Sequence, residues 1–261
     1  MPPPETGQTA ARTDMVGKAL RVLQTIGDGG ASGLTLSEIA RQTGFPLSTV
    51  HRLVGTLARE GYVESDEQTK RHRIGLTVFS LAQRVSSARG YDGTALPVLR
   101  RLAAETQESA LMSVLDRGHQ LYLHHIHGPS QINVIGEPGN RGPLHCTAMG
   151  KVLIAFAPPD VRDDLVATLE LAPRGPHTIT DRQAFAEEIA RVRADGYAVA
   201  DEEHEAGIRA VGVPVLAADG TATAAISVAA PSFRKTRANL VALVPTLALA
   251  AKELALTLPT R

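Results

Sequence analysis

The sequence predicts a two-domain protein of the α+β class. Its 261 residues suit two ordinary domains, at roughly 100–200 residues each. Helical patterns and one short basic hairpin fill the first 75 residues, and strand patterns interspersed with helices fill the rest, which implies an antiparallel sheet. Hydrophobic residues make up 43% and charged residues 21%, a globular composition that excludes a disordered chain.

Composition also excludes several classes of protein. A single cysteine rules out a disulfide framework or a site built from several thiolates, and it fits the reducing cytoplasm, where we expect the protein to act. Aromatic residues make up 3% with no Trp, which argues against a base-stacking platform for single-stranded nucleic acid. The N-terminus lacks the apolar core of a signal peptide, and the longest apolar run, Leu240–Ala251, contains Pro245 and is too short to span a bilayer. We therefore expect no contact with a membrane.

Charge is distributed unevenly along the chain. The first 90 residues hold 11 basic and 8 acidic side chains, a net charge of +3, and the remaining residues carry a net charge of −3. A basic small domain joined to an acidic larger one suits a protein that touches a polyanion with one end only.

Three helices are expected in the first domain, after a loose Pro-rich tail at residues 1–13. Asp14 is a plausible N-cap for the first helix, because apolar residues recur after it at helical spacing. The second helix opens with a Thr-x-x-Glu capping box at Thr35–Glu38 and ends at Gly44. The third runs roughly from Ser48 to Glu60.

The third helix and the hairpin after it form a basic surface. One face of this helix is apolar, and the other carries short hydroxyls that donate to phosphates and longer donors that reach base edges. Two helices joined by a Gly-containing turn, the second with its polar first turns exposed, predict a helix-turn-helix, and the strands Tyr62–Glu64 and Arg71–Ile74 predict a basic wing. The alternative is a small helical domain with a solvated basic face. The predicted DNA-contacting residues are Ser48, Thr49, His51, Arg52, Lys70, Arg71 and Arg73.

A domain boundary follows the hairpin. We expect a winged helix-turn-helix domain at residues 14–75, a linker helix at residues 76–93 that ends near Gly90–Gly93, and a larger domain at residues 94–261. The elements expected in that domain, in chain order, are a helix near Ala95–Gln107, strands at Ala110–Leu115, Gln120–His127 and Gln131–Ile135, helices near Thr147–Phe156, Asp160–Leu169 and Arg182–Asp195, strands at Tyr197–Ala200, Arg209–Leu216 and Ala222–Ala229 with a hairpin turn at Asp219–Gly220, and a helix at Thr236–Thr257.

Several blocks of the sequence resemble the IclR family of bacterial transcriptional regulators. In the first domain they are Lys18–Leu23, Leu34–Leu53 and Arg73–Gly75, with His72 standing where the family usually has Tyr; in the second they are Pro143–Ala155, Glu203–Val215 and Ala225–Pro231. The resemblance implies a ligand-responsive regulator, a repressor of a catabolic operon, with a GAF/profilin-like effector-binding and oligomerisation domain. It implies no cofactor, a homodimer or dimer of dimers, and no enzymatic activity. Since symmetric operators require paired heads, the expected DNA partner is a palindromic operator.

The predicted effector site surrounds Leu144–Gly150. Free N–H groups and the dipole at the start of a helix there favour an anion, although an ordinary capped helix would have the same pattern. The resemblance adds Ala148, Met149, Ala210 and Ser227, and the small apolar Ala210 and Ala229 predict an organic acid with an apolar body. The predicted effector-binding residues are Leu144, His145, Cys146, Thr147, Ala148, Met149, Ala210 and Ser227.

Two rival hypotheses use the same region, an enzyme and a metal-dependent sensor. Cys146 beside His145 could be a nucleophile and its base, but neighbours on a helix point about 100° apart, so no catalytic residue is predicted. The residues that invite a metal hypothesis are His124, His125, His127, His145, Cys146 and His204. They lack any metal-ligand spacing, so no metal site is predicted. We expect the acidic run Asp201–Glu205 to be a solvated loop.

Overall fold

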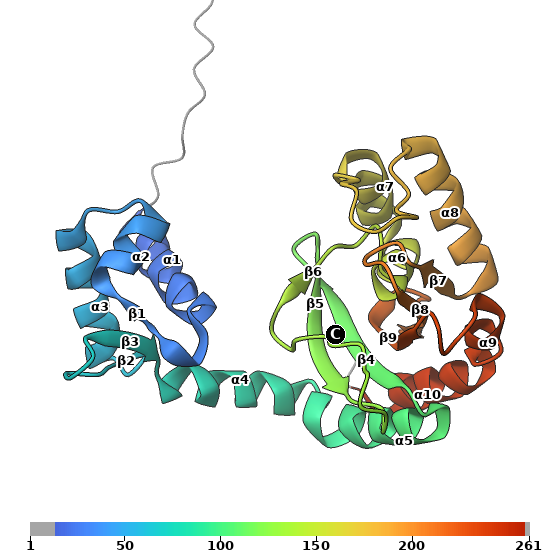
Figure 1. Cartoon of the computed structure of the whole chain (residues 1–261), viewed down its shortest axis with the longest axis horizontal. Coiled ribbons are helices and arrows are strands. Elements are labelled where there is room, and N and C mark those ends of the chain that lie inside the picture. The colour runs from blue at the N-terminus through green and yellow to red at the C-terminus, as the bar shows by residue number, and fades with distance from the viewer. Residues whose placement is uncertain (1–13, 259–261) are drawn as a thin grey trace, which may run out of the picture. The chain divides into compact units, whose positions relative to one another are not determined.

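The computed structural model describes residues 14–258, which divide into two compact units between Val85 and Ser86. The expected tail at residues 1–13 lies outside the described residues. The division falls inside helix α4 (Leu76–Ala88) rather than at Gly90–Gly93, where a single π-helical turn, Tyr91–Ala95, leads into the next helix. Figure 1 labels the elements of each unit.

The N-terminal unit has the three helices and the wing expected from the sequence. Helices α1 (Met15–Asp28), α2 (Leu36–Thr43) and α3 (Leu47–Arg59) enclose a small core, and strands β2 (Val63–Ser65) and β3 (Arg71–Ile74) form the wing. A two-residue strand, β1 (Leu34–Thr35), adds to β3 and makes a three-stranded antiparallel sheet in the order β1-β3-β2.

Local capping fixes the start and the end of α2. The Thr35 N–H donates to Glu38 Oε2 at 2.8 Å, and the Glu38 N–H donates to Thr35 Oγ1 at 3.3 Å, which completes the predicted capping box. Gly44 takes the left-handed conformation with φ +71° and donates its N–H to Ala40 O at 2.9 Å. These contacts join residues at most four positions apart, so both ends of α2 could be predicted from the local sequence.

The C-terminal unit is built on a six-stranded antiparallel sheet in the order β6-β5-β4-β9-β8-β7. The strands are β4 (Ser109–Asp116), β5 (His119–Ile126), β6 (Arg141–Gly142), β7 (Ala198–Asp201), β8 (Ile208–Leu216) and β9 (Ala222–Pro231). The expected α+β class and antiparallel sheet are confirmed.

Alternating side chains along the strands bury both faces of this sheet. Met112 and Ile226 face helices α5 (Leu96–Thr106) and α10, whereas Leu111 and Ala225 face helices α6, α7 and α8. Figure 1 shows α5 and α10 along one side of the sheet and α6 to α8 on the other. Bounds for these helices are Ala148–Ala155 for α6, Pro159–Thr168 for α7, Arg182–Asp195 for α8 and Val244–Thr257 for α10.

The expected strand at Gln131–Ile135 is wrong. The segment is irregular, and β6 takes its place beside β5, with Gln120 opposite Gly142. A Cβ at Gly128 would lie 2.8 Å from the Glu108 carbonyl carbon, so the chain passes Glu108 closely just after β5 ends. Ile132 and Ile135 are exposed, so the apolar residues of this segment do not mark the buried face of a strand.

The expected helix at Thr236–Thr257 is two helices, α9 (Arg237–Val241) and α10, separated at Ala242 and Leu243. Pro245 lies in the first turn of α10, where a proline needs no N–H partner and ends any continuation from before it. By length and composition alone, Arg237–Thr257 is apolar enough to cross a membrane, with mean hydropathy 1.7. Core helices meet the same test, and α10 packs four buried side chains against the sheet unit: Leu247, Ala250, Ala251 and Leu254.

Candidate DNA-contacting face and effector cavity

The polar face of α3 is open to solvent at its first two turns. Ser48, His51 and Arg52 are exposed and Thr49 is half-buried, while Val50, Leu53 and Val54 fill the core on the opposite side. Arg52 Nη2 lies 3.0 Å from Met15 Sδ, so this guanidinium rests against the start of α1. A sulfur is a weak acceptor, which leaves Arg52 free to exchange this contact for a stronger one.

A tight turn positions the basic residues of the wing. Asp66 Oδ1 accepts the N–H groups of Gln68 at 2.9 Å and Thr69 at 3.0 Å, and these hydrogen bonds hold the pKa of Asp66 below its ordinary value. Lys70 follows in the left-handed region, and both it and Arg73 are exposed. His72, where the family usually has Tyr, pairs across the wing with Ser65 Oγ at 2.8 Å, so the departure preserves the hairpin.

Arg71 differs from the other predicted DNA-contacting residues. Its Nη1 donates to Gly33 O at 2.8 Å and lies 3.4 Å from Glu38 Oε2, the carboxylate of the α2 capping box. The guanidinium therefore joins the wing to α2. Arg71 stays a predicted DNA-contacting residue, and a phosphate would compete with these two acceptors, which lie near it because β1 brings Gly33 next to β3.

In the C-terminal unit, a cavity of about 90 Å³ lies between the start of α6 and strands β8 and β9. Six of the eight predicted effector residues line it: Cys146, Thr147, Ala148, Met149, Ala210 and Ser227. Ala200, Ala210 and Ala229 form a row across three neighbouring strands, because Ala210 is opposite Ala200 on β7 and opposite Ala229 on β9. The other lining residues are Leu111, Tyr122, Val134, Ile135, His204, Glu205 and Ile208.

The other two predicted effector-binding residues, Leu144 and His145, do not line this cavity. Leu144 is 1% exposed and packs in the apolar core. His145 points the other way, and its Nε2 lies 2.8 Å from Ala172 O. Both residues precede the helix, in a turn that directs successive side chains to different sides of α6.

Thr147 is a cap rather than a free hydroxyl. Its Oγ1 accepts the Gly150 N–H at 3.0 Å, and the hydroxyl lies 2.5 Å from Gln120 Oε1 and 3.1 Å from Pro143 O. Close packing accompanies this cap, since a Cβ at Gly150 would lie 2.2 Å from Leu144 O. The predicted helix start is thus confirmed, although its hydroxyl is committed to protein partners.

Comparison with known proteins decides the family. The sequence matches the family described as bacterial transcriptional regulator IclR C-terminal over residues 83–256, and the IclR helix-turn-helix domain over residues 15–67. The chain belongs to the IclR family. It is a DNA-binding transcriptional regulator and not an enzyme, as the names of its relatives also indicate.

Two relatives and two solved structures illustrate how far the similarity extends. The HTH-type transcriptional regulator BhcR of Paracoccus denitrificans is 35% identical over 94% of this chain and 87% of its own length, and the probable transcriptional regulator SauR of Cupriavidus necator is 33% identical over 92% and 95%. A putative IclR regulator from Silicibacter has a TM-score of 0.81 at 30% identity, covering 93% of this chain and 95% of its own. An IclR homologue of Microbacterium hydrocarbonoxydans, complexed with 4-hydroxybenzoate, has a TM-score of 0.82 at 28% identity, covering 93% and 98%.

The chemistry of Cys146 in this IclR regulator agrees with a non-enzymatic role. The thiol is fully buried, and burial, together with the nearby Glu203 carboxylate, raises its pKa to about 12. A nucleophilic cysteine needs a lowered pKa and an adjacent base, whereas His145 faces Ala172. Cys146 is therefore a wall of the cavity.

None of the histidines considered from the sequence joins a metal-binding group. Within residues 14–258, the one group with suitable ligand atoms close together is His177, Asp201 and Glu202. Its carboxylates already pair with Arg209, Asp201 at 2.5 Å and Glu202 at 3.3 Å. Three carboxylates of the acidic run, those of Asp201, Glu202 and Glu203, therefore form ion pairs, which differs from the solvated loop expected from the sequence.

Arg71 and Arg73 of this IclR regulator are expected to differ when each is replaced by alanine. Arg71→Ala should destabilise the N-terminal unit by about 1 kcal/mol, because the Gly33 carbonyl loses its donor. Arg73→Ala should leave stability unchanged and reduce the slope of log affinity for DNA against log salt by about 1, as for one lost phosphate contact. Chemical denaturation and fluorescence anisotropy at several salt concentrations measure the two effects. Equal stability of both variants would contradict the assignment of Arg71.

Proposed function

We propose that this IclR regulator is a cytoplasmic repressor of a catabolic operon that responds to an organic acid with an aromatic or otherwise apolar body. The single observation that carries the proposal is the cavity at the start of α6, which combines a helix N-terminus with mostly apolar walls. A helix N-terminus favours a carboxylate, and apolar side chains favour the remainder of such a ligand.

The walls of the cavity support this ligand chemistry. Leu111, Met149, Ala210 and Ala229 provide apolar surface, and the last two leave room where longer side chains would fill it. Burial raises the pKa of Tyr122, so its phenol stays protonated and can donate a hydrogen bond. His204 and Glu205 are polar groups on another wall that could pair with a ligand hydroxyl. The ligand of the Microbacterium hydrocarbonoxydans homologue, 4-hydroxybenzoate, has an apolar aromatic body and a hydroxyl group in addition to its carboxylate.

The DNA partner is a palindromic operator bound by a homodimer or a dimer of dimers. Ser48, Thr49, His51 and Arg52 would read the major groove, and Lys70, Arg71 and Arg73 would contact phosphates. Exposed apolar side chains in the N-terminal unit support pairing with a second copy, since large apolar surfaces mark interfaces. They include Val16 and Leu20 on α1, and Leu76, Phe79 and Val85 on α4, with exposed fractions of 54–74%.

Effector binding would change the equilibrium between two arrangements of the paired heads. A ligand that binds one arrangement more tightly shifts the protein towards it by its difference in affinity for the two. For a repressor of a catabolic operon, we expect the acid to release the operator.

A binding experiment with DNA from upstream of the protein's own gene tests the proposal. We expect a specific gel shift that 4-hydroxybenzoate relieves, and stabilisation of about 2.7 kcal/mol when the acid is at 100 times its Kd. Glyoxylate and pyruvate are the matched comparison, because they share the carboxylate and lack the apolar body. If glyoxylate or pyruvate bound most tightly, the apolar-body assignment would be contradicted. If no specific gel shift appeared, the proposal that the operator lies upstream of the protein's own gene would be contradicted.

A further inference from the structure

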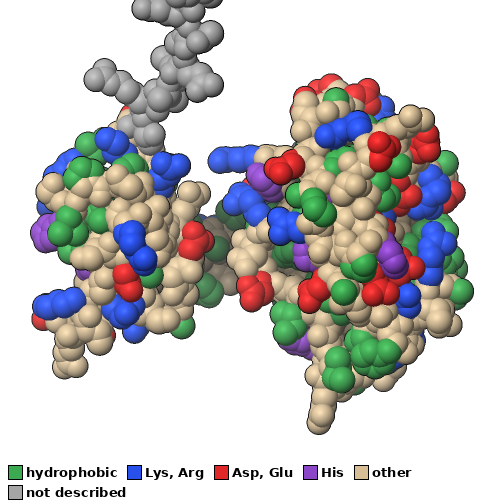
Figure 2. All heavy atoms as spheres, turned by 45° about the horizontal axis from the view of Figure 1, so that its top comes forward, with side chains coloured by type: hydrophobic (Ala, Val, Ile, Leu, Met, Phe, Trp, Pro, Cys, Tyr) green, Lys and Arg blue, Asp and Glu red, His purple; other side chains and the backbone are tan. Residues whose placement is uncertain are grey.

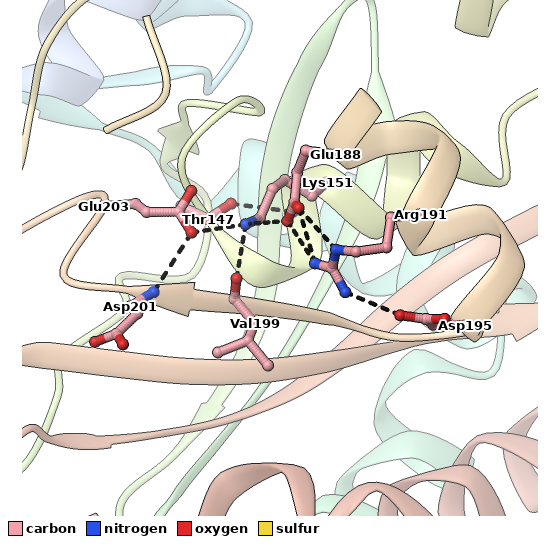
Figure 3. Close-up of polar contacts among 9 residues, drawn as sticks. Thr147, Lys151, Glu188, Arg191, Asp195, Val199, Asp201 and Glu203 are labelled. Carbon is pink, nitrogen blue, oxygen red and sulfur yellow. Dashed lines mark hydrogen bonds and ion pairs between the residues drawn. The ribbon is translucent and has the colours of Figure 1, made fainter. Parts of the chain in front are cut away.

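A lysine is completely buried next to the effector cavity. Lys151 lies on α6, two residues after Met149, and its side chain has an exposed fraction of 0%. Its Nζ donates to Glu203 Oε1 at 2.7 Å, Glu188 Oε1 at 2.8 Å and Val199 O at 2.6 Å (Figure 3). All three ammonium donors are therefore used, as a buried charge requires.

The two carboxylates that hold Lys151 differ in their other partners. Glu188, on α8, also accepts from Arg191, whose Nη2 lies 2.8 Å from it, and Arg191 in turn contacts Asp195 (Figure 3). Within the described residues Glu203 has no second cation: its Oε1 accepts a long hydrogen bond of 3.4 Å from the Asp201 N–H, and its buried Oε2 has no hydrogen-bond partner. Burial raises the pKa of Glu203, and Lys151 opposes that effect. The Glu203 carboxylate consequently depends on Lys151 for its one ion pair within the described residues.

The Lys151–Glu203 ion pair connects two walls of the cavity. Ala148 and Met149, on the first turn of α6, form one wall, and His204 and Glu205, which directly follow Glu203, form another. The Glu203 carbonyl is separately held, accepting from Gly175 N–H at 3.0 Å and Thr178 Oγ1 at 2.6 Å. The loop is thus anchored behind the cavity, and the Lys151–Glu203 ion pair joins it to α6 from within.

We propose that the Lys151–Glu203 ion pair is a clamp that sets the spacing between the start of α6 and the wall at His204–Ile208, so that both residues are positioning residues for effector binding. The inference rests on the proposed function of the cavity. A cavity of about 90 Å³ is smaller than most ligand pockets, at roughly 300–1,000 Å³, so we expect a bound acid to displace a wall. The clamp determines how far this wall moves and where it returns.

Glu203→Met and Glu188→Met form a matched pair, because each removes one carboxylate from the same ammonium and keeps the side-chain length. In full-length protein, we expect Glu203→Met to speed hydrogen exchange of the residue 201–208 backbone by about tenfold or more and to weaken 4-hydroxybenzoate binding by about tenfold. Glu188→Met should speed exchange in α8 and leave binding within about twofold. Operator affinity without ligand should stay at the wild-type value in both variants. Equal effects of the two substitutions on exchange at residues 201–208, or none, would overturn the clamp.

Cys146, the single cysteine, gives a second measurement that needs no effector. The positive charge of Lys151 lowers the pKa of this thiol, so in an unchanged structure Lys151→Met would slow its reaction with 4,4′-dithiodipyridine. A released wall would expose the buried thiol and speed the reaction instead. We expect faster labelling, and slower labelling overturns the proposal; if Lys151→Met does not fold, exchange in Glu203→Met decides. If the variants show faster exchange or labelling but the wild-type protein binds no acid, the proposed effector is refuted. The role of the ion pair in holding the wall is then still supported.

Discussion

Replacing Met149 by Glu is expected to abolish effector binding, with a loss of more than about 100-fold, and to leave operator binding intact. Met149 is 4% exposed, lines the cavity, and accepts a hydrogen bond from Ser113 Oγ at 3.3 Å. A carboxylate there would repel the carboxylate of the ligand in buried surroundings, where like charges interact more strongly than in water. The predicted DNA-contacting residues belong to the other compact unit, so they should be unaffected.

Met149→Gln is the matched control, because it has nearly the same shape as Glu and no charge. Its affinity for 4-hydroxybenzoate should fall much less than that of Met149→Glu, and the ratio of the two isolates the electrostatic repulsion. Isothermal titration gives both dissociation constants, and a gel shift without ligand confirms that each variant still binds the operator. A normal response of Met149→Glu would place the effector elsewhere.

Replacing Arg52 by Ala is expected to weaken operator binding by about 1–3 kcal/mol if Arg52 reads a base edge. The affinity for unrelated DNA should change much less, because phosphate contacts dominate that binding. Arg59→Ala is the control, since Arg59 lies in the last turn of α3 and contacts Thr56 Oγ1 at 3.3 Å. Competition binding with operator and unrelated DNA measures the specificity ratio, and an unchanged ratio for Arg52→Ala would remove this residue from base recognition.

Helices with local stop and start signals could be predicted closely from the sequence. The expected bounds of the helix at Arg182–Asp195 agree with α8, because Asp181 caps its first turn and Gly196 takes a left-handed conformation after its last. The strand expected at Gln131–Ile135 depended on apolar alternation alone. The segment instead follows a close approach of Gly128 to Glu108, a non-local contact that no window of neighbouring residues reveals.

The candidate sites show the same limit. The cavity wall at Cys146–Met149 could be predicted because it is one continuous helix start, and Ala210 and Ser227 came from resemblance to the family. Val134, Ile135, His204 and Glu205 could not, since they lie on irregular segments that only the fold brings together. Lys151 could not be predicted for a physical reason: a lysine within an apolar helix gives no sign of its partners, which lie 37 and 52 residues away.

The row of Ala200, Ala210 and Ala229 has a consequence for how this lineage can change over time. Each residue lies on a different strand of one sheet, and the main chain of each is held by its neighbours whatever the side chain. A mutation from alanine to a hydroxyl- or carboxylate-bearing residue at any of the three would therefore alter the depth and polarity of the cavity, while the ladder of backbone hydrogen bonds keeps the scaffold. Descendants of one ancestral gene could in this way acquire responses to different nutrients through single substitutions, without rebuilding the domain that reads DNA.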